Sequence, residues 1–364
     1  MKICFLTNNY SFIGGLERVL SIVSNELSKT NDVSIISLYD LSKKCPYNYK
    51  DNIKKNIIIN KNRKNYLLDY FRCLSGVKKL VYQNKYDFLI FLGENMSIFA
   101  QNACKNTTTK CIYWMHNSAW FYHYPFLEKH LRIIAIKKSN YTITLTKDSK
   151  NELIRKYSIK NIVNISNPAD DVLLNKKIDY NNQSKKIITV GRISKEKNYI
   201  KLVDIASKVF SVHPEWLWDI YGDGEDKLKK EILEKIRINK LNNNLFLKGN
   251  SNNIYDLYNN YSFQVMTSMF ESFPMVLVEG MSCGLPLVSF DIKTGPSEII
   301  EDGVNGFLIN DLNINTISNR IIYLIENPDK RKEMSMNNEN LRLRYSTHEI
   351  GKMWIDFLTS IKNN

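Results

Sequence analysis

The chain has 364 residues, 43% of them hydrophobic and 24% charged, with a formal net charge of +14 at pH 7. Its length exceeds the ~150 residues of a typical domain and its composition excludes a disordered chain, so we expect two packed domains. No apolar run approaches the ~18 residues that a membrane-spanning helix requires.

The distribution of charge indicates what kind of partner the protein has, and the cysteines indicate its compartment. Residues 1–185 carry a net charge of +15 and residues 186–364 carry −1, which predicts a polyanionic or membrane-surface partner for the first half. The alternative is a solvated surface in a chain that is rich in lysine throughout. The six cysteines include no CxxC pair and no metal-ligand spacing, so we expect reduced thiols in a cytoplasmic protein.

The first half alternates short apolar strands with amphipathic helices, the pattern of a doubly wound parallel sheet. Gly14-Gly15 separates the first strand, residues 2–7, from a helix at 16–27. This pair either lets backbone N–H groups approach a phosphate or forms a plain turn. His116 follows a strand at 111–115, where ligands of such sheets gather, although an ordinary loop histidine is the alternative. Further elements are expected as strands at 33–38, 57–59, 88–92, 141–145 and 162–165, and as helices at 65–84, 127–138 and 148–157.

A second α/β pattern follows a polar stretch. Residues 167–184 lose hydrophobic periodicity and are interpreted as a linker. We therefore expect an N-terminal domain at 1–166, a C-terminal domain at 185–345 and a final helix at 346–364 that could cross back to the first domain. Strands of the second domain are expected at 187–190, 218–221, 245–247, 263–267, 287–289 and after residue 304, with helices at 200–210, 226–239, 254–259, 314–326 and 348–362. The two similar layouts predict two domains with a cleft between them.

The stretch from Ser268 to Ser289 is the most specific in the chain. Pro274 suits the first turn of a helix and Gly284 a left-handed position at its end. Glu271 and Glu279 lie eight positions apart, which places one carboxylate at the mouth of the helix and the other roughly two turns in. Two such carboxylates could hold the oxygens of a polyhydroxylated, phosphorylated ligand. The alternative is one acid stabilised by the helix dipole and one that is solvated.

Arg192 and Lys197 form a second candidate cluster. Both lie in the loop between the strand at 187–190 and the next helix. A guanidinium fork and an ammonium group there could clamp a diphosphate and stabilise the charge of a leaving group. Two surface charges in a lysine-rich chain are the alternative.

Together these segments resemble the glycosyltransferases of family 4, which have the GT-B architecture of two Rossmann-like α/β domains facing each other across a cleft. The resemblance covers nearly the whole chain and is strongest in the second half. Its most specific part is the pair of glutamates, Glu271 and Glu279, set between Phe-Pro and Gly-Leu-Pro. The other matching segments are Gly14-Gly15 and residues 113–117, 191–197, 221–224, 295–300 and 305–306.

The resemblance implies roles in binding a nucleotide-sugar donor. Arg192 and Lys197 would neutralise its diphosphate, with Gly15 lining the diphosphate and acceptor side. Glu279 would accept hydrogen bonds from the ribose hydroxyls. The implied reaction retains the anomeric configuration and needs no metal or other cofactor.

The resemblance also implies how the donor sugar is held. Glu271 and the backbone of Phe273, Pro274 and Met275 would bind the sugar hydroxyls and phosphate. His116, from the first domain, would lie beside the donor sugar as a catalytic residue. The preceding residue is Met115, where an acidic residue is often seen in the family.

The expected function is transfer of a hexose from a UDP-hexose or UDP-N-acetylhexosamine to a surface glycan or its lipid-linked precursor. The basic helix at 127–138 carries Lys129, Arg132, Lys137 and Lys138 around an apolar stretch. An interfacial helix on the inner face of the cell membrane has this composition, so a peripheral membrane location is expected.

Three alternatives stay open at this point. A nucleotide-sugar epimerase would keep the fold and change the reaction, and a sugar-binding protein would bind the donor without turnover. A nucleic-acid or polyanion-binding protein would use the basic half. Nucleic-acid binding is disfavoured because Trp114 and Trp120 cluster beside His116 rather than along a basic stripe.

Overall fold

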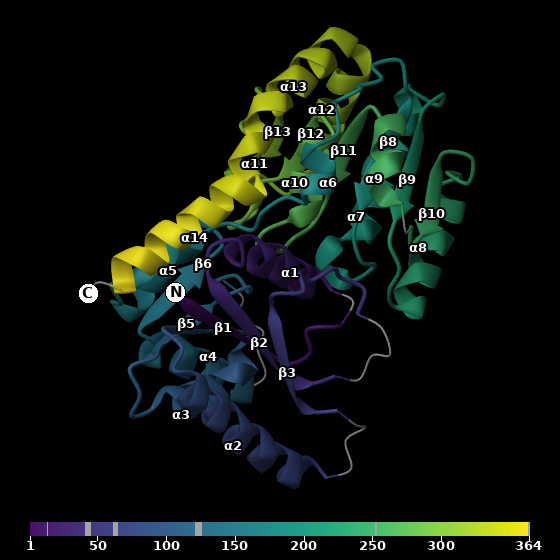
Figure 1. Cartoon of the computed structure of the whole chain (residues 1–364). Coiled ribbons are helices and arrows are strands. Elements are labelled where there is room, and N and C mark those ends of the chain that lie inside the picture. The colour runs from purple at the N-terminus through teal and green to yellow at the C-terminus, as the bar shows by residue number, and fades with distance from the viewer. Residues whose placement is uncertain (13, 41–44, 61–64, 121–125, 252, 363–364) are drawn as a thin grey trace. The chain divides into compact units, whose positions relative to one another are not determined.

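The computed structural model describes residues 1–12, 14–40, 45–60, 65–120, 126–251 and 253–362 (Figure 1). The chain divides into two compact units: unit 1 is Met1–Pro168 with Thr347–Asn364, and unit 2 is Ala169–Ser346. The expected boundary after residue 166 lies close to this division. The final helix belongs to unit 1, and most of the stretch interpreted as a linker, 167–184, belongs to unit 2.

Unit 1 is built on a parallel sheet whose strands, over the described residues, run in the order β3-β2-β1-β4-β5-β6-β7. Three helices, α2, α3 and α4, pack on one face of this sheet. On the other face, α14 lies beside α1. The strands are β1 (Lys2–Thr7), β2 (Asp32–Tyr39), β3 (Lys54–Ile59), β4 (Phe88–Leu92), β5 (Lys110–Trp114), β6 (Tyr141–Thr144) and β7 (Ile162–Asn164). The helices are α1 (Gly15–Leu27), α2 (Tyr66–Asn84), α3 (Ser97–Cys104), α4 (Phe126–Lys138), α5 (Lys147–Tyr157) and α14 (Thr347–Lys362), with a short 3-10 turn η1 (Glu94–Met96).

Helix α14 is held to the core of unit 1 by an aromatic cluster. Trp354 is fully buried, and its ring centroid lies 4.9 Å from that of Trp114 and 6.4 Å from that of Phe5. Gly351 permits the close approach of α14 to α1, because a Cβ there would lie 2.5 Å from the side chain of Glu26. The last helix of the chain therefore packs on the sheet of unit 1, although it follows unit 2 in the sequence.

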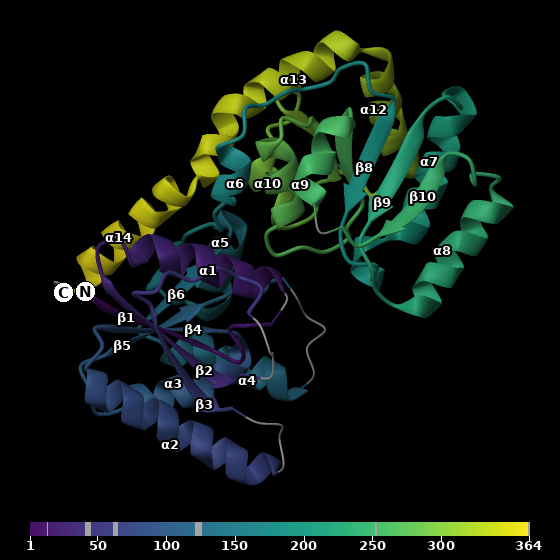
Figure 2. The same ribbon diagram turned by 45° about the vertical axis from the view of Figure 1, so that its right-hand side comes forward.

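Unit 2 repeats the same architecture on a parallel sheet in the order β10-β9-β8-β11-β12-β13, over the described residues. Helices α7, α8 and α12 pack on one face, and α6, α9 and the turn η3 contribute to a second apolar cluster on the other (Figure 2). The strands are β8 (Lys186–Val190), β9 (Leu217–Tyr221), β10 (Leu245–Gly249), β11 (Phe263–Met266), β12 (Leu287–Phe290) and β13 (Gly306–Ile309). The helices are α6 (Asp171–Leu174), α7 (Tyr199–Val212), α8 (Asp226–Ile238), α9 (Ile254–Leu257), α10 (Met275–Ser282), α11 (Pro296–Ile299), α12 (Ile314–Glu326) and α13 (Pro328–Leu341), with 3-10 turns η2 (Lys195–Lys197), η3 (Tyr258–Asn260) and η4 (Arg342–Tyr345).

The doubly wound α/β class predicted from the sequence is confirmed for both units. The helix expected at 314–326 coincides with α12, and most other elements differ by a residue or two at their ends. Helices α3 and α13 were not expected. The stretch interpreted as a linker packs against unit 2, where the hydroxyl of Tyr180 donates to the carbonyl of Ser262 at 2.6 Å. Among the described residues, no helix is both long and apolar enough to pass through a bilayer.

Candidate functional site

The second sheet has a position where ligand binding is expected from topology alone. After β8 the chain builds outward through β9 and β10, and it then returns to the other side of β8 with β11. The strand order reverses between β8 and β11, and ligands of doubly wound sheets bind outside the carboxyl ends of the strands at such a point. The loop after β8 carries Arg192 and Lys197, and the loop after β11 carries Glu271.

Lys197 and Glu271 form an ion pair at this reversal point. The Nζ atom of Lys197 lies 2.5 Å from Oε1 of Glu271, and the hydroxyl of Ser268 donates to the same oxygen at 2.7 Å. Both side chains are largely shielded, with 18% of Lys197 and 12% of Glu271 exposed. A partly buried pair keeps more of its Coulomb attraction than a surface pair does, so the ammonium group is held in a defined place.

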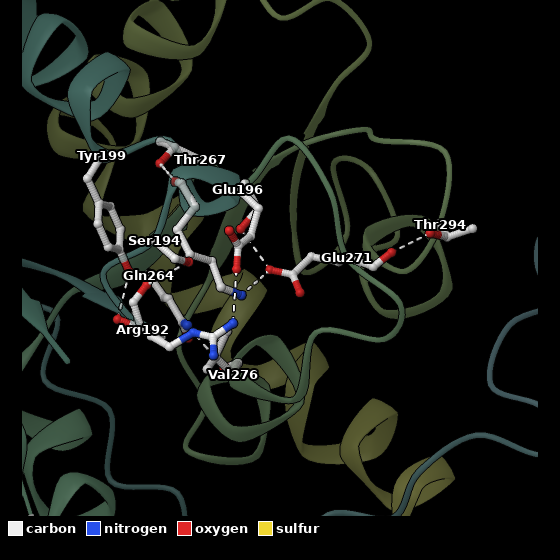
Figure 3. A network of polar contacts seen from close by, with 12 residues as sticks. Arg192, Ser194, Glu196, Tyr199, Gln264, Thr267, Glu271, Val276 and Thr294 are labelled. Atoms are coloured by element: carbon white, nitrogen blue, oxygen red, sulfur yellow. Dashed lines mark hydrogen bonds and ion pairs between the residues drawn. The ribbon is translucent and has the colours of Figure 1, made fainter. Parts of the chain in front are cut away.

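The two loops are joined by further hydrogen bonds that fix this pair (Figure 3). The hydroxyl of Thr267 donates to the carbonyl of Lys197 at 2.9 Å, and the amide of Met269 donates to the carbonyl of Glu196 at 2.8 Å. On the far side of the turn, the hydroxyl of Thr294 donates to the carbonyl of Glu271 at 2.5 Å. The backbone on both sides of the ion pair is therefore anchored by bonds that do not involve the side chains of Lys197 and Glu271.

Arg192 takes a different position from Lys197. Its side chain is 73% exposed, and its guanidinium lies 3.1 Å from Glu196 in the same loop. It lines a cavity of about 400 Å³ together with Tyr221 and Asn250, at the ends of β9 and β10. Because the side chain is long and solvated, it can turn into this cavity with little cost in lost contacts.

Two glycines after β9 let that loop pack against the loop after β8. A Cβ on Gly222 would lie 2.0 Å from the carbonyl oxygen of Gly191, and a Cβ on Gly224 would lie 2.0 Å from that of Ile193. The hydroxyl of Tyr199 donates to the same Gly191 carbonyl at 2.9 Å. Burial, followed by the charges of Glu271 and Glu196, raises the pKa of Tyr199, so it stays a neutral donor.

Gly222→Ala is expected to lower the free energy of unfolding of unit 2 by about 2–4 kcal/mol, because the added methyl group meets a backbone carbonyl at a φ of +139°. Guanidinium denaturation followed by tryptophan fluorescence, to which Trp216 and Trp218 of unit 2 contribute, would measure it. Gly303→Ala is the matched control, since Gly303 has φ +74° and an open Cβ position, and about 1 kcal/mol is expected there. An equal effect of the two substitutions would contradict the steric explanation.

Glu279 lies on α10, the helix that follows Glu271. It is 9% exposed, and its two oxygens face the hydroxyls of Tyr255 and Tyr258 at 3.4 and 3.5 Å. These long contacts leave the carboxylate able to accept stronger hydrogen bonds from a ligand. Burial and the nearby Glu279 charge raise the pKa of Cys283 to about 12, so this thiol is not a nucleophile.

The start and end of α10 follow the sequence prediction closely. Pro274 is the N-cap, one position before the first helical residue Met275, and Gly284 adopts a left-handed φ of +81° beyond the helix. Phe273 is buried against Tyr345, with ring centroids 5.7 Å apart. The turn is thus rigid, and its backbone amides lie at the positive end of the helix.

The remaining candidates, Gly15 and His116, lie at the carboxyl edge of the sheet of unit 1. Gly15 is the exposed first residue of α1, and the hydroxyl of Tyr47 holds the preceding Gly14 by accepting from its N–H at 2.9 Å and donating to its carbonyl at 2.7 Å. The ring of His116 lies 4.5 Å from that of Trp114. Burial lowers the pKa of His116 to about 3, so the imidazole is neutral at physiological pH.

The structure adds side chains that sequence reasoning missed. Ser268 and Thr294 hold Glu271, and Tyr255 and Tyr258 face Glu279. Ser268 lies only three positions before Glu271, a short separation that could have revealed the first of these. In unit 1, Asn117 donates to both oxygens of the buried Glu94 at 3.2 Å. Among the described residues, no group of three or more histidine, cysteine or acidic side chains is arranged to hold a metal ion.

The two parallel-sheet, Rossmann-like units place the chain in the GT-B fold class. The same fold is found in a mutant of Staphylococcus aureus TarM in complex with fondaparinux, alpha-GlcNAc-glycerol and UDP, at a TM-score of 0.79 and 18% identity over 98% of this chain and 100% of that one. Anabaena Alr3699/HepE in complex with UDP gives a TM-score of 0.81 at 19% identity, over 99% and 100% of the two chains.

Residues 173–341 match the family model Glycosyl transferases group 1. The matched segment contains Arg192, Lys197, Glu271 and Glu279, and over these residues the chain is similar to the group 1 glycosyltransferases. The protein is therefore an enzyme, a glycosyltransferase.

Curated relatives agree with this assignment. An uncharacterized glycosyltransferase of Haemophilus influenzae is 28% identical over 97% of this chain and 98% of its own. The amylovoran biosynthesis glycosyltransferase AmsD of Erwinia amylovora is 28% identical over 98% and 99%. The poly(ribitol-phosphate) alpha-N-acetylglucosaminyltransferase of S. aureus is 32% identical over 61% of this chain and 44% of its own. Two of these names refer to polymers, amylovoran in one and poly(ribitol-phosphate) in the other.

Proposed function

We propose that this glycosyltransferase moves a hexose from a UDP-hexose or UDP-N-acetylhexosamine to a surface glycan or its lipid-linked precursor, with retention of the anomeric configuration. The observation that carries the proposal is the Lys197–Glu271 ion pair at the reversal point of the second sheet. Related solved structures hold UDP and, for Alr3699/HepE, UDP-glucose, which supports a uridine nucleotide as the donor.

The geometry suggests how the donor would be held. A diphosphate entering beside Lys197 would compete with Glu271 for the ammonium group and would be joined by Arg192 turning from the surface. Glu271, relieved of part of this contact, could then accept hydrogen bonds from sugar hydroxyls. Glu279 would exchange its long contacts with Tyr255 and Tyr258 for ribose hydroxyls.

The proposed bond changes are those of a same-face displacement, in which neither Glu271 nor Glu279 acts as a nucleophile. The bond between the anomeric carbon and the phosphate oxygen breaks with its electron pair passing to the phosphate, and the acceptor oxygen bonds to the same face. The acceptor proton passes to the departing phosphate oxygen. Lys197 stabilises the growing phosphate charge, and the neutral His116 could orient the sugar but not protonate the leaving group. We propose this course without a metal or other cofactor.

The acceptor side is proposed to lie in unit 1. Its carboxyl edge carries Gly15 and His116, and two relatives are named for amylovoran biosynthesis and as a poly(ribitol-phosphate) alpha-N-acetylglucosaminyltransferase. A glycan precursor on a lipid carrier would require the enzyme to work at the inner face of the cell membrane, as a peripheral protein.

A screen of UDP-, GDP- and ADP-sugars for nucleotide release, with membrane extract as the acceptor source, tests the proposal. We expect release from a UDP-sugar that depends on the acceptor and gives a labelled glycan. Release from none of these donors, or release from a GDP- or ADP-sugar alone, would contradict the proposed donor. An epimerase would instead convert the donor without any acceptor, and no observation favours that reaction or nucleic-acid binding.

A further inference from the structure

Helix α2 of unit 1 exposes an apolar surface to solvent. Leu67, Leu68, Phe71 and Tyr82 are 67%, 53%, 56% and 72% exposed. Single exposed apolar residues are ordinary, but four on one helix mark an interaction surface. Figure 1 shows α2 on the outside of unit 1, and none of the unit's described elements covers these four side chains.

The exposed residues share one face of α2 with basic side chains. At 3.6 residues per turn, Leu67, Phe71 and Tyr82 project within about 60° of one another. Lys78 falls inside this arc, while Leu68, Lys79 and Arg72 follow on its flank, and all are exposed. Cys73, Val77 and Val81 occupy the other, buried face.

Acidic residues are missing from this exposed face. The one acid of α2 is Asp69, which is 4% exposed and lies 3.4 Å from the guanidinium of Arg72. Arg72 nevertheless keeps 69% of its side chain exposed. An ordinary solvated helix mixes both signs of charge, whereas a face of leucine, aromatic and basic residues is typical of helices that lie in a membrane interface.

Helix α4, expected from the sequence to be the interfacial helix, has a smaller exposed apolar surface than α2. Arg132 is buried and donates to the carbonyl of Ser118 at 2.7 Å. Leu131, Ala135 and Ile136 are also buried in the core. Phe126 and Leu127, in its first turn, are 80% and 68% exposed, so α4 offers two exposed apolar side chains where α2 offers the four named above.

The position of α2 suits the reaction. Strand β3 ends at Ile59 and α2 begins at Tyr66, so the first turns of α2 start at the carboxyl edge of the sheet. Gly15 and His116 lie at the same edge. A bilayer that contacts Leu67, Leu68 and Phe71 would bring a lipid-linked acceptor towards the residues proposed to receive it.

We propose that unit 1 docks on a bilayer containing anionic lipids through the exposed face of α2, which we call the α2 face: Leu67, Leu68, Phe71, Arg72, Lys78, Lys79 and Tyr82. The apolar side chains enter the boundary between headgroups and acyl chains, and the basic ones contact anionic headgroups. Complementary charge supports this occupant, because residues 1–185 carry +15. The inference deepens the proposed function, on which it rests for the choice of a lipid-linked acceptor.

Flotation of the full chain with vesicles tests the docking. Wild-type protein is expected to bind vesicles of phosphatidylcholine with phosphatidylglycerol, and to bind pure phosphatidylcholine at least about tenfold more weakly. The triple variant Leu67→Gln, Leu68→Gln, Phe71→Gln is expected to lose at least about tenfold in partition coefficient. Its matched control changes Leu233, Ile238 and Met336 of unit 2, which are 51%, 65% and 64% exposed, to glutamine and should bind as wild type does.

A second variant separates a membrane from a soluble polyanion. Arg72→Gln, Lys78→Gln, Lys79→Gln should also lose at least about tenfold on anionic vesicles, while Lys227→Gln, Lys230→Gln, Lys332→Gln in unit 2 should not. Loss of binding in this variant alone, with the apolar variant unaffected, would indicate a soluble polyanion and overturn the proposal. Equal binding to both kinds of vesicle, or binding to neither, would also overturn it.

The docking and the proposed function can fail separately. Nucleotide release from a UDP-sugar with a water-soluble acceptor should be unchanged in both α2 variants, which also shows that they are folded. If the wild-type enzyme releases no nucleotide but binds anionic vesicles through the α2 face, the proposed donor reaction is wrong and the docking stands.

Discussion

Lys197→Ala is expected to lower kcat/KM for sugar transfer by at least about 100-fold, or roughly 2.7 kcal/mol of transition-state stabilisation. The ammonium group lies at the reversal point of the second sheet, held by Glu271 at 2.5 Å. Negative charge on the departing diphosphate grows in the transition state, so the loss should fall mainly on kcat. Steady-state kinetics of nucleotide release from the donor found in the screen would measure it.

Three further variants are compared with Lys197→Ala, and the first of them is its control. Lys227→Ala removes an exposed lysine of α8 and should leave the rate unchanged. Arg192→Ala should have a smaller effect than Lys197→Ala, because Arg192 is 73% exposed and must leave Glu196 to reach a ligand. Lys197→Arg keeps the charge but not the geometry, and we expect partial activity. A near-normal rate for Lys197→Ala would remove the residue from the site.

Local sequence signals predicted α10 and its turn accurately. Proline is favoured where a helix begins because its fixed φ is helical and its missing N–H costs nothing there. Gly284 follows the helix with φ +81°, a conformation that residues with a Cβ avoid. Such signals depend only on the nearest few residues, which is why they could be interpreted without the fold.

Helix α13 shows where this kind of reasoning fails. Its sequence, Pro328–Leu341, is mostly polar and has no apolar stripe. Polar anchors hold it instead: Arg331 donates to the carbonyls of Ile325 and Asn182, at 2.9 and 2.8 Å, and Asn338 donates to that of Leu285 at 2.9 Å. Hydrophobic periodicity detects burial of apolar faces only, so a helix fixed by buried polar groups escapes it.

The site could be predicted as two separate clusters but not as one. Lys197 and Glu271 are 74 positions apart, and their contact depends on β8 and β11 being neighbours in the sheet. No local pattern contains that pairing, and the same holds for Tyr255 and Tyr258 facing Glu279. The α2 face was missed for a related reason, since exposure depends on which side of α2 packs against the rest of unit 1.

Glu271→Ala is expected to lower kcat/KM by at least about 100-fold as well, for two reasons that can be separated. The carboxylate positions Lys197, and it is proposed to accept hydrogen bonds from the donor sugar. Glu271→Gln keeps an acceptor oxygen but removes the charge that holds the ammonium group, and it should recover part of the rate. Kinetics with the same donor would measure both variants, with Glu301→Ala as a control for removal of an acid from unit 2.

The double variant Lys197→Ala, Glu271→Ala distinguishes the two roles. If Glu271 acted only by positioning Lys197, the double variant would be no slower than Lys197→Ala alone. We expect it to be at least about tenfold slower, because the contacts to the sugar are lost in addition, yet faster than the product of the two single effects, because part of each effect is shared. A double variant equal to Lys197→Ala would assign Glu271 to positioning and would contradict the proposed contact with the sugar. A fully multiplicative result would mean that the observed ion pair contributes nothing to catalysis.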